Sequence, residues 1–313
     1  MAFTGLLAYL AMLSPVLASH SAASHAATPV PVLTTRANET QPAAGGPYLA
    51  WTESSRAHPL RADAYARRAG QPRFKLNPHG TVGFTSAGAI DGTRIVYQQR
   101  SSPYSTGVLK FFDLATRKRS KAPPGVNTPG EQCCASLSGR WLLFERGTVQ
   151  GFRHGRPPQR VILFDLVTMR ARQLDVAPKR GFVEPGTVRG NYASWGKCLP
   201  GGCHGYVYNI ATGKTVRIPS PSQRPEYALA VTANGIVYFA ESKNSDCGSD
   251  ATLWRYPLGG ARNRLLSFPH GIDVSTVDPF VNTDGSTTLL YDRIRCKPVE
   301  SDIFKLSLGP GKR

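Results

Sequence analysis

Short apolar segments recur along the chain at a nearly constant spacing, each preceded by a glycine and each ending in an aromatic residue. The segments are PYLAW, TRIVY, RWLLF, NYASW, IVY and STTLLY, and the glycines before them are Gly46, Gly92, Gly139, Gly190, Gly235 and Gly285. Successive glycines are 46, 47, 51, 45 and 50 residues apart. The segments have the length of buried β-strands, and glycine supplies the positive φ of a tight hairpin turn. The pattern predicts one such hairpin in each of six repeats.

A second apolar motif lies downstream in every repeat and stays in phase with the first. Its copies are AYARRAG, FFDLATRK, LFDLVTMR, VYNIATGK, WRYPLGGA and IFKLSLGP, and in the first five repeats another short strand follows, such as RQLDV or KTVRIP. Each repeat therefore supplies four antiparallel strands. A single sheet of this kind cannot bury both of its faces, so six of them must pack as a ring. We predict an all-β, six-bladed β-propeller over residues 45–308.

The two ends of the chain predict how the ring closes. After DIFKLSL only the tail 309–313 remains, which leaves no residues for a fourth strand in the sixth blade. The run PVPVLTT at 29–35, within an N-terminal segment 27–44, favours a β-strand and belongs to no repeat. We expect this N-terminal strand to pair with Asp302–Leu308, which would close the last blade and cover an exposed sheet edge.

The first residues have the character of a secretory signal. Leu6–Ala18 is an apolar run of 13 residues, too short to span a bilayer, and small residues follow it. Cleavage after Ala18 or after Ala26 fits this pattern, although the first five residues carry no Lys or Arg. We predict a signal peptide at 1–26, an extracytoplasmic or secreted mature protein at the cell envelope, and no membrane span after cleavage.

The composition adds a charge argument to the fold prediction. The 31 Gly and 25 Pro exclude long helices, and 38 Lys and Arg against 20 Asp and Glu give a net charge of +18. Many of the cations lie in the turns between third and fourth strands, including Arg117, Lys118, Arg119 and Arg262, while Arg153, His154 and Arg156 lie in a long loop without acids. A solvated surface would account for them. The alternative is contact with an anionic envelope polymer or a protein partner. Nucleic acid ranks last because no aromatic residues are interleaved with the cations.

The repeat resembles a known family. YNIATGK and FDLAT fit an aromatic-Asp-aliphatic-x-Thr-Gly turn, and together with the strand-Asp-Gly-strand element they are similar to the repeats of TolB-type propellers, particularly secreted actinobacterial ones. The resemblance covers roughly residues 45–308. It implies the propeller fold and leaves the function open. Asp113 and Asp165 within the motif are expected to accept backbone hydrogen bonds of the turn.

Six cysteines behind a signal peptide predict disulfide bonds. Cys198 and Cys203 flank a Leu-Pro-Gly-Gly turn between two strands of blade four, so one hairpin would bring them together. Cys247 and Cys296 occupy equivalent loops of blades five and six, which would allow a bridge between neighbouring blades.

The remaining pair, Cys133 and Cys134, lies in the innermost strand of blade three, as a vicinal disulfide or as two free thiols. Cys198, Cys203 and His204 come nearest to metal-ligand spacing, but we predict no metal and no cofactor. No motif of a zinc hydrolase, serine hydrolase or P-loop enzyme occurs. We therefore expect a monomeric, non-enzymatic binding or scaffold propeller. The alternative is a lyase or hydrolase acting on a carbohydrate or another extracellular substrate at the central channel.

Overall fold

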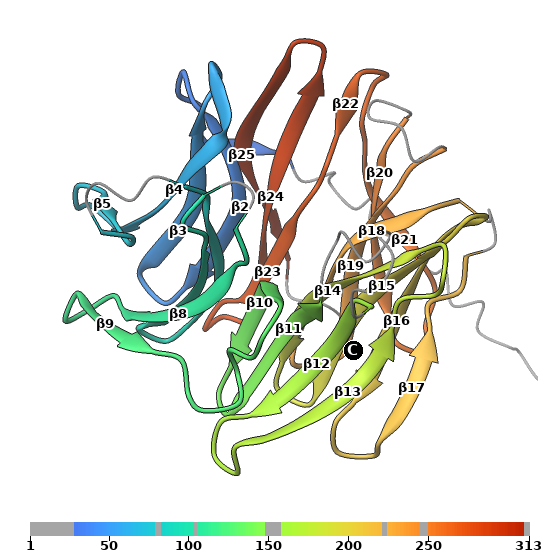
Figure 1. Ribbon diagram of the computed structural model, residues 1–313. Coiled ribbons are helices and arrows are strands. Elements are labelled where there is room, and N and C mark those ends of the chain that lie inside the picture. Colours follow the sequence, from blue (N-terminus) through green and yellow to red (C-terminus); the bar gives the residue numbers. More distant parts are fainter. Residues whose placement is uncertain are drawn as a thin grey trace, which may run out of the picture.

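Six antiparallel sheets form a ring around a central axis (Figure 1). The structure is a computed structural model that describes residues 28–78, 83–102, 105–147, 158–220, 224–243 and 250–309. All named elements in these ranges are β-strands. No helix long and apolar enough to cross a membrane occurs in the described part of the chain. The predicted signal peptide at 1–26 lies outside the described residues.

The predicted repeat of four strands is present in the first five blades, ordered from the axis outward. Blade one contains β2 (Asn38–Gly45), β3 (Tyr48–Ser55), β4 (His58–Arg68) and β5 (Phe74–Lys75), and blade two contains β6 (Thr85–Asp91), β7 (Arg94–Gln99), β8 (Val108–Asp113) and β9 (Lys118–Lys121). Blade three contains β10 (Glu131–Ser138), β11 (Trp141–Gly147), β12 (Arg160–Asp165) and β13 (Arg170–Val176). Blade four contains β14 (Phe182–Arg189), β15 (Tyr192–Leu199), β16 (Gly202–Asn209) and β17 (Lys214–Arg217), and blade five contains β18 (Glu226–Val231), β19 (Ile236–Glu241), β20 (Thr252–Pro257) and β21 (Asn263–Ser267).

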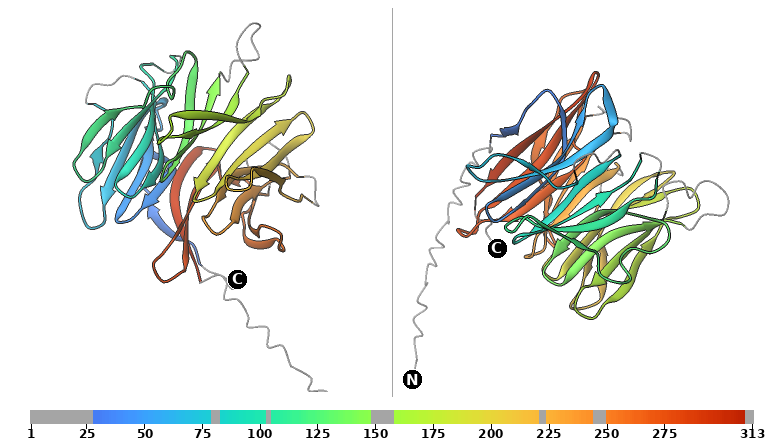
Figure 2. Two further views of the ribbon diagram at one scale, coloured as in Figure 1. Left: turned by 90° about the horizontal axis from the view of Figure 1, so that it is seen from below. Right: turned by 60° about the vertical axis from the view of Figure 1, so that its left-hand side comes forward.

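Blade six is closed by the N-terminal strand, as the sequence predicts. It contains β23 (Val277–Val281), the short β22 (Ile272–Asp273), β24 (Thr287–Cys296) and β25 (Val299–Leu308), and β1 (Val30–Leu33) forms its outer edge. Val30 pairs with Lys305 and Leu33 with Ile303. Figure 2 shows the blue N-terminal strands beside the red C-terminal ones. The innermost strand of blade one is β2, which comes before the first glycine of the repeat pattern.

The repeated glycines form turns and the repeated aromatic residues are buried, as the sequence pattern indicates. All six glycines have positive φ, between 55° and 80°, at the turn between the first and second strands. The repeated aromatic residues lie within the second strands, which continue beyond them, and all are fully buried: Trp51, Tyr97, Phe144, Trp195, Tyr238 and Tyr291. They belong to five of the six apolar clusters that lie between neighbouring blades, with Tyr238 and Tyr291 in the same cluster. The ring is therefore held together by contacts between blades.

Strand order gives the disc two different faces. The turn between third and fourth strands is hydrogen-bonded to the glycine turn of the same blade, for example through Leu114 N to Thr93 O at 2.7 Å and Leu166 N to Arg140 O at 2.8 Å. Both kinds of turn therefore lie on one face, which we call the turn face. The loops between second and third strands and the connections between blades lie on the opposite face, which we call the loop face.

Candidate functional site

A pocket lies on the axis of the ring, where the innermost strands of all six blades meet. Residues of β2, β6, β10, β14, β18 and β23 line it, and its volume is about 120 Å³. This space admits several water molecules, an ion or a short side chain. It is too small for a folded partner or a polymer, which must therefore bind elsewhere on the molecule.

Bulges at equivalent positions determine which side chains reach this axial pocket. The pairing of the first and second strands shifts by one residue in each of blades one to five. At the bulge Gln41, Cys134 and Ala228 adopt positive φ, of 52°, 56° and 52°. Gly88 and Gly186 occupy the position in blades two and four, where a Cβ atom would come within 2.5 Å of Val96 O or 2.2 Å of Leu229 O. Only Gln41 and Cys134 therefore bring polar or reactive groups to the pocket from the bulges.

The bulge in blade three places two thiols side by side. Successive side chains of a regular strand point to opposite faces, yet here the Sγ atoms of Cys133 and Cys134 are 2.7 Å apart. Both cysteines are free, with Cys133 buried and Cys134 exposed to the pocket. Of the two states that the sequence leaves open, the structure contains the two free thiols. The Cys133 thiol donates to Glu145 Oε2 at 3.4 Å, and Gln159 Nε2 donates to Glu145 Oε1 at 3.0 Å.

The surroundings of the two thiols favour their protonated form. The hydrogen bond with Cys134, together with burial, raises the pKa of the Cys133 thiol well above its usual value. The contact with Cys133 lowers the pKa of Cys134, but burial near Glu145 and Glu184 outweighs it and the pKa is raised. Burial also raises the pKa of Glu145 to about 7. A nucleophilic cysteine needs a lowered pKa, so Cys134 does not have the character of an activated nucleophile.

The carboxyl of Glu184 also lines the axial pocket. Its side chain is exposed to the axial pocket, and it forms no hydrogen bond or ion pair with the described residues. Burial within the ring raises the pKa of this carboxyl.

An ion pair joins blades four and six across the axis. Arg189, at the end of β14, donates to Asp278 Oδ1 of blade six at 2.7 Å and to Leu137 O of blade three at 3.1 Å. Asp278 Oδ2 accepts Ala44 N of blade one at 2.8 Å. Burial raises the pKa of Asp278, with Arg189 acting against that rise. These two side chains thus link four blades at the centre of the ring.

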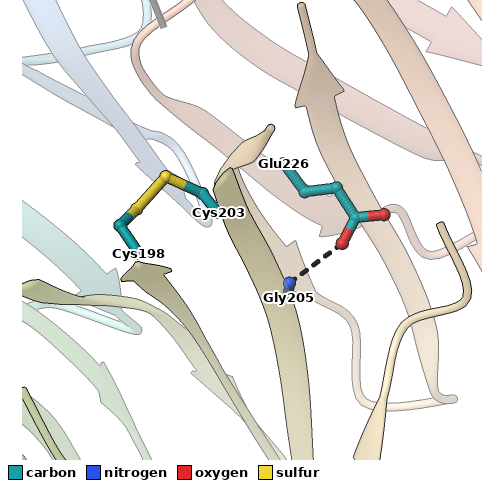
Figure 3. The surroundings of a disulfide bond; sticks show 4 residues. All are labelled: Cys198, Cys203, Gly205 and Glu226. Carbon is teal, nitrogen blue, oxygen red and sulfur yellow. Dashed lines mark hydrogen bonds between the residues drawn. A yellow bond between two sulfur atoms is a disulfide. The ribbon is translucent and has the colours of Figure 1, made fainter. Parts of the chain in front are cut away.

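The predicted Cys198–Cys203 disulfide is present at the tip of the β15–β16 hairpin (Figure 3). The hairpin is attached to the next blade because Gly205 N donates to Glu226 Oε2 at 2.9 Å. Since the sulfurs are joined to each other, they cannot ligate a metal with His204. Cys296 is also disulfide-bonded. Cys247 lies outside the described residues, so the Cys247–Cys296 pairing stays a prediction.

Basic side chains collect on the outer strands and outer turns of blades one to five. This basic rim consists of Arg67, Arg68, Arg117, Lys118, Arg119, Lys121, Arg170, Arg172, Lys214, Arg217 and Arg264. None of them forms an ion pair with a carboxylate in the described ranges. Of the neighbouring cations Arg117, Lys118 and Arg119, two also pack on blade one. The Arg117 guanidinium lies 4.6 Å from the Phe74 ring, and Arg119 Nε donates to Leu76 O at 2.8 Å. Lys118 is exposed and has no such contact.

One cation of the turns does not belong to this rim. The Arg262 side chain is only 11% exposed and is ion-paired with Glu241 and, at 3.7 Å, with Glu226. Its guanidinium carbon lies 4.8 Å from the centre of the Phe239 ring and 4.6 Å from that of Trp254. The expectation that Arg262 faces solvent is therefore wrong, because buried carboxylates of blade five bind it. Arg153, His154 and Arg156 lie outside the described residues.

The turn aspartates of the repeat motif have the structural role expected of them. Asp113 Oδ1 accepts Thr116 N at 2.7 Å, and Asp165 Oδ1 accepts Val167 N at 2.9 Å. The hydrogen bonds from Thr116 lower the pKa of Asp113, and Arg140 lowers that of Asp165. Both expectations are confirmed.

Known structures share this fold. A TolB from Agrobacterium tumefaciens matches with a TM-score of 0.58 and 12% identity, over 88% of this chain and 91% of that one. TolB from Acinetobacter baumannii matches with a TM-score of 0.52 and 14% identity, over 85% and 64%. A prolyl endopeptidase matches with a TM-score of 0.51 and 14% identity, and this chain spans only 42% of its length. No protein-family model matches the chain, and no curated protein is similar to it in sequence. The fold is thus that of the TolB-like six-bladed propellers, and identities this low extend to the fold alone.

Sequence reasoning did not find the axial groups Arg189, Asp278, Glu145 and Glu184. The available signal was the repeat phase, since the bulge residues lie a few positions before each repeated glycine, where the innermost strands must face the axis. Side-chain direction at a bulge, however, is not readable from strand alternation.

Proposed function

We propose that this protein is an extracytoplasmic binding module, in which the basic rim attaches a closed propeller to an anionic polymer of the cell envelope. The proposal rests on one observation. On the outer strands, all charged side chains without an ion-pair partner in the described ranges are Lys or Arg. Within β9, β17 and β21 there is no Asp or Glu, and the one acid of β13, Asp175, is bound to Lys197 Nζ at 2.7 Å.

Protection of sheet edges explains part of this pattern, because charged side chains on an outer strand, Lys especially, prevent pairing with another sheet. A rim made only of Lys and Arg gives a positive field around the disc, which attracts polyanions and speeds their association. A net charge of +18 agrees with this field.

An extracytoplasmic location is supported by the Cys198–Cys203 bond and by the predicted signal peptide. TolB-like propellers among the structural neighbours favour a binding or scaffold role over an enzymatic one. We extend the proposal to a secreted protein of the actinobacterial TolB-like type, on the sequence resemblance. The pocket-facing thiol of Cys134, with its raised pKa, favours this reading over a hydrolase that uses a thiol nucleophile.

Charge reversal at two places on the disc tests the location of the contact. Lys118→Glu with Lys214→Glu changes unpartnered cations of the basic rim in blades two and four. Lys179→Glu with Arg180→Glu makes the same change in net charge on exposed residues between β13 and β14. On a column of anionic wall polymer, the rim variant should elute at lower salt than the wild type, and the control variant should elute with the wild type. Equal losses in both variants would mean that only net charge matters, and would contradict the proposed rim contact.

A further inference from the structure

The thiol pair of blade three, together with Glu145, has the composition of a metal site. Cys133 Sγ, Cys134 Sγ and a carboxylate oxygen of Glu145 lie within 4.8 Å of one another. They come from two adjacent strands, β10 and β11, that pair directly through Cys133 and Glu145. We propose that Cys133, Cys134 and Glu145 bind a thiophilic divalent cation of the zinc type, which would be reached through the axial pocket.

The donor set matches what such a cation prefers. Zn²⁺ is bound by cysteine sulfur and carboxylate oxygen in tetrahedral sites, and three protein ligands leave the fourth position for water. The axial pocket, to which Cys134 is exposed, supplies that position. Both cysteines are free, in contrast to Cys198 and Cys203, so both sulfurs are available as ligands.

Groups around the ligands orient them and favour positive charge. Gln159 holds one carboxylate oxygen of Glu145, which leaves the other oxygen directed at the Cys133 thiol. Partners of this kind fix the ligands of metal sites. Glu184 also lines the pocket and has no partner among the described residues, so it adds negative charge where a cation would enter. In a protein of net charge +18, this acidic and thiol-rich axis is a local exception.

Binding requires a small adjustment of the exposed thiol. Tetrahedral bonds of about 2.3 Å hold two sulfurs about 3.8 Å apart, against 2.7 Å between the two thiols here. A shift of about 1 Å of the Cys134 sulfur into the pocket supplies the difference. Each thiol releases one proton as its sulfur binds the cation, so two thiolates and the carboxylate surround the divalent cation and the site carries one net negative charge.

Cadmium binding to the whole reduced protein tests the proposal, because a cadmium–thiolate bond gives an ultraviolet charge-transfer band. After mild reduction, peptide mapping should find Cys133 and Cys134 as thiols with Cys198–Cys203 still linked. We expect one Cd²⁺ per chain with the charge-transfer band, competition by Zn²⁺, and a higher melting temperature in the presence of the metal. Cys134→Ser and Glu145→Gln should each weaken binding at least tenfold.

Glu226→Gln is the matched control, since Glu226 is also a buried glutamate whose pKa burial raises to about 7, but no thiol lies beside it among the described residues. It should bind Cd²⁺ like the wild type. Absence of the band, unchanged affinity in Cys134→Ser or Glu145→Gln, or recovery of the pair only as a mutual disulfide after reduction would each overturn the proposal.

Discussion

Arg189 and Asp278 illustrate what a single residue pair contributes to this ring. Their side chains are 14% and 6% exposed, and they connect blades four and six across the axis. Removing one partner leaves the other charge buried without compensation, which typically costs about 3–5 kcal/mol. We expect Arg189→Met to lower the free energy of unfolding by an amount in this range, measured by denaturant titration.

The exposed ion pair Arg56–Glu300 provides the comparison for this prediction. Its side chains are 42% and 24% exposed, and such pairs contribute at most about 1 kcal/mol. Arg56→Met should therefore change stability little. Similar losses in the two variants would show that the axial pair is not a buried, coupled one.

Glu226 gives a prediction about pH at the same scale. Burial raises its pKa to about 7, with Arg262 acting against and Glu241 adding to the rise. Between the unfolded value near 4.5 and pH 7, the folded protein holds a proton that the unfolded chain releases, so stability falls as pH rises. The slope for one group is at most about 1.4 kcal/mol per pH unit.

The Glu226→Gln variant has no carboxyl at this position, so its stability lacks this dependence on pH. The stability difference between Glu226→Gln and the wild type should shift in favour of the variant as pH rises from 4.5 to 7. Melting temperatures of both proteins across this range measure the shift. A constant difference would show that folding does not raise the pKa of the Glu226 carboxyl.

At the scale of elements, the β15–β16 hairpin combines two restraints, the Cys198–Cys203 bond and the hydrogen bond from Gly205 to Glu226. The disulfide closes a short loop, and the chain-entropy model gives about 2 kcal/mol for such a loop. We expect Cys198→Ser with Cys203→Ser to lower the free energy of unfolding by about this amount without changing the fold. Thermal denaturation and circular dichroism check it, and a loss of the β-sheet spectrum would contradict a purely local role.

The elements were predictable because their signals are local. A positive-φ glycine, a short apolar strand and a buried aromatic residue lie within a few positions of each other in every repeat, and the ring follows because one blade cannot bury both faces. Closure by β1 was predictable from the missing outer strand of the last blade. The axial site was not predictable, since Arg189 and Asp278 are 89 positions apart and meet only once the ring has closed. The burial of Arg262 was not predictable for the same reason, because its carboxylate partners come from other strands of the folded blade.

At the scale of the whole molecule, the two charge patterns have opposite signs in different places. The axis holds thiols and carboxylates, whereas the outer strands β9 and β17 hold Lys and Arg without ion-pair partners in the described ranges. A narrow pocket suits a small cation, and a broad rim suits an extended polyanion. Substitutions should therefore weaken the two binding events independently: Glu145→Gln affects the axial site, and changes at Lys118 and Lys214 affect the rim.

Salt dependence of binding tests the rim most directly, because binding to a polyanion releases condensed counterions in proportion to the charges neutralised. The measurement is the dissociation constant for a soluble anionic wall polymer at several salt concentrations, for the wild type and for Lys118→Gln with Lys214→Gln. We expect log K of the wild type to fall steeply with log salt, and the variant to have a slope smaller by about two. A wild type without salt-dependent binding, or identical slopes in both proteins, would contradict the proposal that the basic rim is the binding surface.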